Sequence, residues 1–86
     1  MEVGVGQVVF SKCGRDKGGA FVVLSVEGEY VFLTDGQLRP LSKPKKKKVR
    51  HTQPTHDVMG TVNQGGLTDA DIRKWLLQYK CERGGK

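Results

Sequence analysis

The sequence predicts a small, mainly β domain: a barrel of four to five short strands followed by one C-terminal α-helix. β-Branched and aromatic residues gather in short runs in the first half of the chain, and glycine-containing turns separate these runs. The C-terminal end instead carries apolar residues at helical spacing. A length of 86 residues corresponds to one domain, which leaves little room for a deep active-site cavity.

The first half of the chain contains the turn signals that separate the strands. Glu27-Gly28 predicts a tight turn between the second and third strands, and Asp35-Gly36 is a stronger hairpin signal before the fourth. Pro40 has no N–H group to donate, so the fourth strand is expected to be short or at an edge. The strands are expected at residues 8–10, 21–26, 30–34, 37–41 and 49–51.

The C-terminal helix is predicted by the residues at its start. Thr68 is a suitable N-cap, and Asp71 three residues later forms a variant of the capping box. Leu67 and Ile72 have the spacing of a hydrophobic staple around this cap. Glycines at 84 and 85 are expected to end the helix.

One face of this helix is apolar and must pack on another surface, because a lone helix of this length is marginal in water. We expect it to dock on the open side of the barrel. The alternative is that the face binds a second copy or a partner protein. The face consists of Ile72, Trp75, Leu76 and Tyr79.

The segment between the barrel and the helix shows no sustained periodicity. It contains Pro54 and several glycines, which predicts a linker or an ordered loop with few contacts. The chain is therefore divided into a barrel at 1–52, a linker at 53–66 and a helix at 67–81.

The positive charge of the chain is concentrated in one segment. Lys and Arg number 15 against 9 Asp and Glu, for a formal net charge of +6, and a basic protein of this kind suits a polyanionic partner. The rest of the chain nearly balances, so the excess charge lies within residues 43–50. The cations of this basic run are Lys43, Lys45, Lys46, Lys47, Lys48 and Arg50.

The basic run has three possible interpretations. It could be a solvated loop, a nuclear import signal, or a strand or loop that contacts phosphates. Its position beside the predicted barrel favours phosphate contact, with the lysines extending along a barrel edge.

A glycine-rich loop between the first two expected strands, Gly14-Arg15-Asp16-Lys17-Gly18, resembles the KOW motif of RNA-binding proteins. The Asp35-Gly36 turn and the Lys43-Pro44-Lys45-Lys46 segment strengthen the resemblance, which covers residues 5–51. The chain looks most similar to KOW-containing large-subunit ribosomal proteins of eukaryotes and archaea, and to their small bacterial relatives. Phe21 stands where many KOW motifs have another glycine, and the region after residue 52 has no counterpart in the motif.

The resemblance implies an SH3-like β-barrel that binds RNA, with ribosomal RNA as the expected partner, as a structural or accessory component of the large ribosomal subunit. It places RNA contacts on the loop and on the basic run, where cations meet phosphates and glycines shape the backbone. The loop residues concerned are Lys12, Gly14, Arg15, Lys17, Gly18 and Gly19. Tyr30 and Phe32 could contact bases, although core or half-buried strand positions are favoured for both.

The spacing of the residues gives little support for a metal site or a catalytic site. Cys13, Cys81, His51 and His56 do not have the spacing of a zinc site, and no catalytic set can be assembled. We therefore expect a cytoplasmic, non-catalytic protein without a cofactor or a membrane span. The alternative function is a protein-interaction or transcription-elongation-associated module whose Trp-bearing helix is the partner interface.

Overall fold

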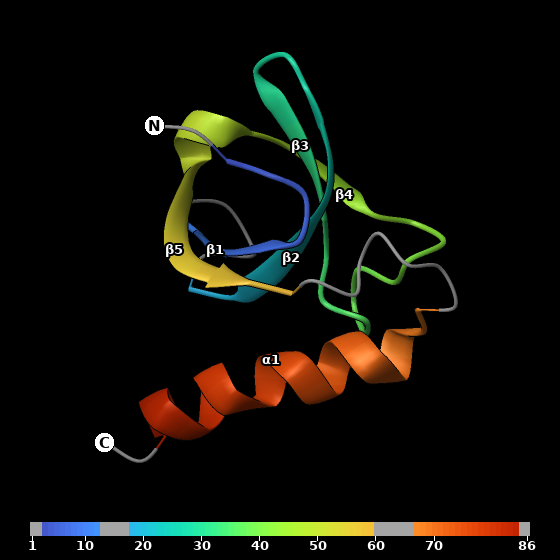
Figure 1. Cartoon of the computed structure of the whole chain (residues 1–86), viewed down its shortest axis with the longest axis vertical. Helices are drawn as coiled ribbons and strands as arrows, with labels where there is room; N and C mark the ends of the chain where they lie inside the picture. Colours follow the sequence, from blue (N-terminus) through green and yellow to red (C-terminus); the bar gives the residue numbers. More distant parts are fainter. Residues whose placement is uncertain (1–2, 13–17, 60–66, 85–86) are drawn as a thin grey trace.

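The computed structural model describes residues 3–12, 18–59 and 67–84. Within these ranges, five strands form one antiparallel sheet in the order β4-β3-β2-β1-β5, followed by one α-helix (Figure 1). The elements are β1 (Gln7–Ser11), β2 (Ala20–Glu27), β3 (Tyr30–Thr34), β4 (Lys45–Lys48), the 3-10 turn η1 (Val49–His51), β5 (Thr52–Val58) and α1 (Asp69–Gly84). The predicted mainly β class with a C-terminal helix is confirmed. The sheet is strongly curved, but β4 and β5 remain its two edges, so it is not closed into a barrel.

Two interior strands, β1 and β2, contain residues that are buried on both faces of the sheet. In β1, Val8 faces α1 while Val9 faces the inside of the curved sheet, and both are fully buried. Burial on both faces explains why these strands are continuous apolar runs rather than alternating ones. The core cluster under the helix contains Val8, Val22, Met59, Ile72 and Leu76. The cluster inside the curve contains Val9, Phe21, Val23, Val31 and Leu33.

The turn predicted at Glu27-Gly28 is confirmed. Glu27 pairs with Tyr30, which leaves Gly28 and Glu29 as a two-residue hairpin loop. Gly28 has a φ of 59°, a conformation that glycine adopts without the steric penalty of a side chain.

The strand predicted at 37–41 is not formed. The Asp35 carboxylate accepts hydrogen bonds from the backbone N–H groups of Gln37 and Arg39, each at 2.8 Å. These bonds close residues 35–39 into a compact loop and occupy N–H groups that a sheet ladder would need. The fourth strand is instead the lysine segment Lys45–Lys48, which pairs with β3.

The segment after the basic run also differs from the prediction. Residues 49–51, predicted as a strand, form η1, and the predicted linker at 53–66 begins with strand residues. β5 pairs with β1 along the sheet edge, where Pro54 can lie opposite Val9. An edge strand tolerates proline and polar residues because only one of its two sides must be hydrogen-bonded. The sequence of β5 therefore lacks the hydrophobic pattern by which strands are predicted. Residues 60–66 of the predicted linker lie outside the described residues.

The predicted capping box of the helix is confirmed. The Asp71 N–H donates to Thr68 Oγ1 at 3.2 Å, and the Thr68 N–H donates to Asp71 Oδ2 at 3.1 Å. Leu67 packs against the same core cluster as Ile72, in agreement with the predicted staple. No helix of the described chain is long and apolar enough to cross a membrane.

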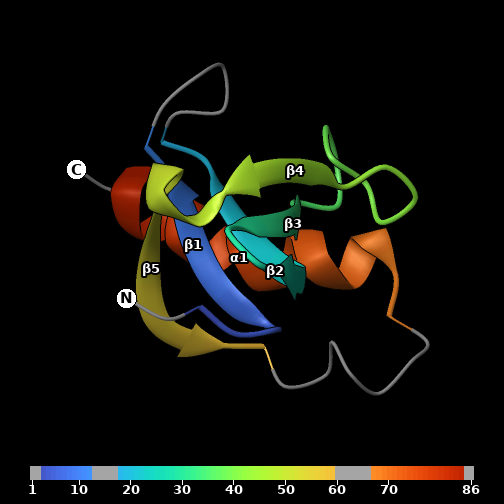
Figure 2. The same ribbon diagram turned by 90° about the horizontal axis from the view of Figure 1, so that it is seen from above.

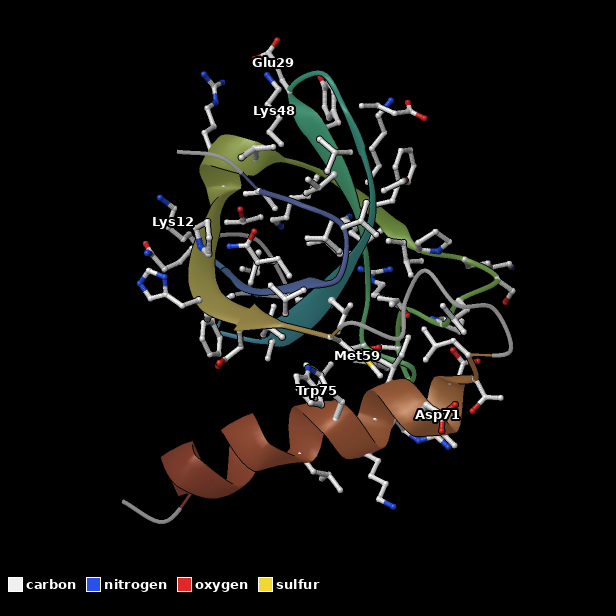
Figure 3. All side chains as sticks on the ribbon, viewed as in Figure 1. Lys12, Glu29, Lys48, Met59, Asp71 and Trp75 are labelled. Atoms are coloured by element: carbon white, nitrogen blue, oxygen red, sulfur yellow. The ribbon has the colours of Figure 1, made fainter. Side chains whose placement is uncertain are left out.

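The helix docks on its own sheet, as expected. Ile72 and Leu76 are buried against Val8 and Val22, with Trp75 half-buried beside them. Figure 2 shows α1 running across one face of the sheet, and Figure 3 shows Trp75 on the side of the helix that faces the strands. The side chain of Tyr79, the fourth residue of the predicted apolar face, lies outside the described residues.

The loop after β3 contacts the start of α1. Arg73 Nη1 donates to the carbonyl of Gly36 at 2.6 Å, and the Leu41 N–H donates to Asp69 Oδ1 at 2.8 Å. Gly36 has a φ of 73°, and a Cβ there would collide with the backbone carbonyl of Asp69. The Asp35-Gly36 signal therefore marks a helix-docking loop rather than a hairpin.

Candidate nucleic-acid interface

The central part of the basic run is an edge strand. Four consecutive lysines form β4 and pair with β3 in an antiparallel register. Since residues directly opposite each other share a face of the sheet, Lys46 and Lys48 lie on the face of Phe32 and Tyr30. The other two lysines, Lys45 and Lys47, lie on the face of Leu33 and Val31. The run therefore presents cations on both faces of one sheet edge, as expected for lysines along an edge.

The ring of Tyr30 lies close to the two β4 lysines that share its sheet face. The Lys46 Nζ lies 4.6 Å from the centroid of the Tyr30 ring, and the Lys48 Nζ lies at 6.0 Å. These are cation–π distances, which hold the ammonium groups near the ring while leaving them accessible to anions. Tyr30 and Phe32 are half-buried strand residues, as favoured by the sequence analysis. Tyr30 and Phe32 lie on the same sheet face as Val22. The helix α1 packs on this face over β1 and β2, where it contacts Val8 and Val22.

A second group of cations surrounds a pocket at one end of the curved sheet. Lys12 at the end of β1, Lys48 at the end of β4 and Arg50 in η1 line this pocket, whose volume is about 690 Å³. Glu29, from the β2–β3 turn, contributes one carboxylate to the lining. Figure 3 shows the side chains of Lys12, Glu29 and Lys48 around this end of the molecule. Lys48 belongs to both the pocket and the Tyr30 face, so it links the two groups of cations.

Backbone hydrogen bonds hold the walls of the pocket together. The Lys12 N–H donates to the His51 carbonyl at 2.9 Å, which ties β1 to η1. The Val49 N–H donates to the Glu29 carbonyl at 2.8 Å, which ties η1 to the β2–β3 turn. Thr52 Oγ1 donates to the Val49 carbonyl at 2.6 Å and closes the 3-10 turn. The cations are therefore carried by a backbone whose elements are joined to one another.

The glycines predicted to shape the loop after β1 have an observable role. The Gly18 N–H donates to the Ser11 carbonyl at 2.9 Å, and the Ser11 N–H donates to the Gly19 carbonyl at 3.0 Å. These bonds close the base of the β1–β2 loop, and Gly18 has a φ of 86°. The predicted loop contacts Gly14, Arg15 and Lys17 lie outside the described residues.

The predicted site residues do not all gather in one place. Lys12, Lys48 and Arg50 meet at the pocket, although they lie far apart in the sequence or on different elements. Lys43 is exposed in the loop before β4, where its N–H donates to the Pro40 carbonyl at 2.9 Å. It therefore lies before the start of the strand that ends at the pocket.

Several pocket residues were missed by the sequence analysis. Val26, Glu29 and Val49 line the pocket, yet none of them stands in a motif. The signal that could have located them is the Glu27-Gly28 turn combined with the 3-10 turn at 49–51, and the second of these was predicted as a strand. The pocket depends on η1, whose residues have no distinctive turn chemistry.

Comparison with known proteins adds no relative, since neither a protein-family model nor a curated protein matches the chain. The KOW resemblance therefore stays a prediction based on the residues quoted above.

Proposed function

We propose that the chain is a non-catalytic RNA-binding protein that contacts phosphates through the β4 lysines and the cations around the pocket. The observation that carries the proposal is β4 itself, an edge strand made entirely of lysines beside further cations. Phosphate contacts by lysine and arginine supply most of the affinity of such surfaces without reading base sequence.

The finer assignment is an SH3-like barrel of the KOW type. It is supported by the β1–β2 hairpin with a glycine-shaped loop base, by the strong curvature of the sheet and by η1 between β4 and β5. The KOW resemblance then favours ribosomal RNA, with the protein as a structural or accessory component of the large subunit.

The alternative, a partner interface on the apolar face of α1, has less support. Ile72 is fully buried and Leu76 is 3% exposed, both against the chain's own sheet. A partner could reach these two side chains only after α1 had left the sheet, which would expose the core cluster to water.

Sedimentation of cell lysate through sucrose gradients at low and high salt tests the ribosomal assignment. We expect the protein to migrate with large subunits at low salt. Loss from these fractions at high salt indicates an electrostatically held accessory protein, and retention indicates an integral component. A protein that stays in the light fractions at low salt contradicts the ribosomal assignment and favours the interaction or transcription alternatives.

A further inference from the structure

We propose that the pocket at the end of the curved sheet receives one unpaired nucleotide of the bound RNA. This inference rests on the proposed RNA-binding function and adds a recognition element to it. The pocket would make the protein selective for RNA that has an extruded base. The charge of the surface alone would not provide this selectivity.

The size of the pocket suits a single nucleotide. Its volume of about 690 Å³ falls within the range of roughly 300–1,000 Å³ that is typical of small-molecule sites. A paired RNA helix is much wider than such a pocket and can only lie across its rim. The nucleotide that enters must therefore be unpaired.

The pocket combines an apolar surface with a polar rim. Val3 and Val49 line the pocket and also pack against the core cluster inside the curve of the sheet, which holds these two side chains in place. Val26 lines it as well and is 39% exposed, an apolar side chain that a base would cover. Unstacked bases in RNA commonly stack on aromatic rings or on the guanidinium planes of arginine, and the pocket offers the guanidinium of Arg50.

The charged residues of the rim suit the phosphate and ribose of the same nucleotide. Three cations, Lys12, Lys48 and Arg50, outnumber the one carboxylate of Glu29. The guanidinium group of Arg50 can bind a phosphate through paired hydrogen bonds or stack on a base. The exposed amide of Gln53 also lines the pocket and offers both a donor and an acceptor to a base edge.

Continuity with β4 favours RNA over an acidic peptide as the occupant. Lys48 lines the pocket and also lies 6.0 Å from the Tyr30 centroid, so a phosphate backbone following β4 reaches the pocket rim. An acidic peptide would satisfy the cations but would bring no flat apolar group for the valine surface.

The test compares three RNA hairpins with the wild-type chain. The first carries a single bulged uridine, the second carries an abasic residue at the bulge, and the third is fully paired. The first two have equal numbers of phosphates, so their difference reports the base alone. We expect the bulged uridine to bind about fivefold to tenfold more tightly than the abasic hairpin, because only the base removes the apolar surface of the valines from water.

Substitution within the pocket then locates the effect. Val26→Ser removes apolar surface from the pocket without changing charge, and we expect it to reduce the preference for the bulged base. Leu38→Ser is the matched control, because Leu38 is 79% exposed and does not line the pocket. Unchanged affinity of both variants for the paired hairpin shows that they are folded.

The outcomes separate this inference from the proposed function. Equal affinity for all three hairpins, with a steep salt dependence, overturns the nucleotide pocket and leaves phosphate binding intact. Weak binding of all three that is insensitive to salt overturns the proposed function itself. A hexaglutamate peptide that binds wild type more tightly than any of the three hairpins, with no preference among the hairpins, overturns the nucleotide assignment in favour of an acidic peptide.

Discussion

Lys46 places its Nζ 4.6 Å from the centroid of the Tyr30 ring, across the β3–β4 ladder. Lysine is not a strong β-former, so four consecutive lysines in a strand need support from their neighbours. Pairing with β3 supplies the backbone hydrogen bonds, and the Tyr30 ring supplies a surface for the lysine stems and ammonium groups. The cations are thereby held in an extended row before any polyanion arrives.

The first prediction concerns this aromatic support. Tyr30→Ala should weaken RNA binding by about twofold to fivefold, because a surface cation–π contact is worth about 0.5–1 kcal/mol. Tyr30→Phe retains the ring and should bind like wild type. Fluorescence anisotropy with a paired RNA hairpin measures both. Equal losses in the two variants would show that the hydroxyl group, and not the ring, matters.

The second prediction tests the contact between the loop after β3 and the start of α1. Gly36→Ala places a Cβ against the carbonyl of Asp69 at a positive φ, and should lower the free energy of unfolding by about 1–3 kcal/mol. Gly18→Ala also has a positive φ, but among the described residues no atom lies within 4 Å of the added Cβ, so a smaller loss of about 1 kcal/mol is expected. Urea denaturation compares them. A loss at Gly36 no larger than that at Gly18 would contradict the close contact with α1.

The third prediction distinguishes the buried face of α1 from its exposed face. Leu76→Ala should lower the free energy of unfolding by about 2–5 kcal/mol, since it leaves a cavity in the core cluster. The adjacent Leu77 is 52% exposed, and Leu77→Ala should change stability by less than about 0.5 kcal/mol. Thermal unfolding of the two variants gives the comparison. Similar effects at both positions would mean that α1 is not docked through Leu76.

The fourth prediction concerns the capping box. Thr68→Ala removes the oxygen that accepts from the Asp71 N–H and should lower the free energy of unfolding by about 0.5–2 kcal/mol. Thr68→Ser keeps the hydroxyl and should remain close to wild type. If the serine variant loses as much stability as the alanine variant, the hydroxyl bond is not the source of the effect.

The elements with strong local signals could be predicted from the sequence. β1, β2 and β3 are runs of β-branched and aromatic residues, and the turn at Gly28 lies between two of them. The start of α1 could be predicted because the reciprocal bonds of Thr68 and Asp71 depend only on residues three positions apart. In each case the signal that predicts the element lies within a few residues of the sequence.

The remaining elements depend on contacts that are distant in sequence. β4 is stabilised by β3 and Tyr30, and β5 is placed by β1. The loop at Asp35-Gly36 carries a hairpin signal, but Asp35 binds the N–H groups of its own loop and Gly36 meets α1. The pocket could not be predicted because Lys12, Glu29 and Arg50 come together only when η1 carries the chain from one edge strand, β4, to the other, β5.

The salt dependence of RNA affinity tests the central claim most directly. With about four to six phosphate contacts, the affinity of the wild-type chain should fall roughly 10²–10³-fold between 50 and 200 mM salt. Replacing Lys45, Lys46, Lys47 and Lys48 by Ala should weaken binding at low salt and flatten this dependence, whereas Lys74→Ala, at an exposed position on α1, should leave the slope unchanged. An affinity that is insensitive to salt, or a slope that the β4 substitutions do not alter, would contradict phosphate binding by this surface.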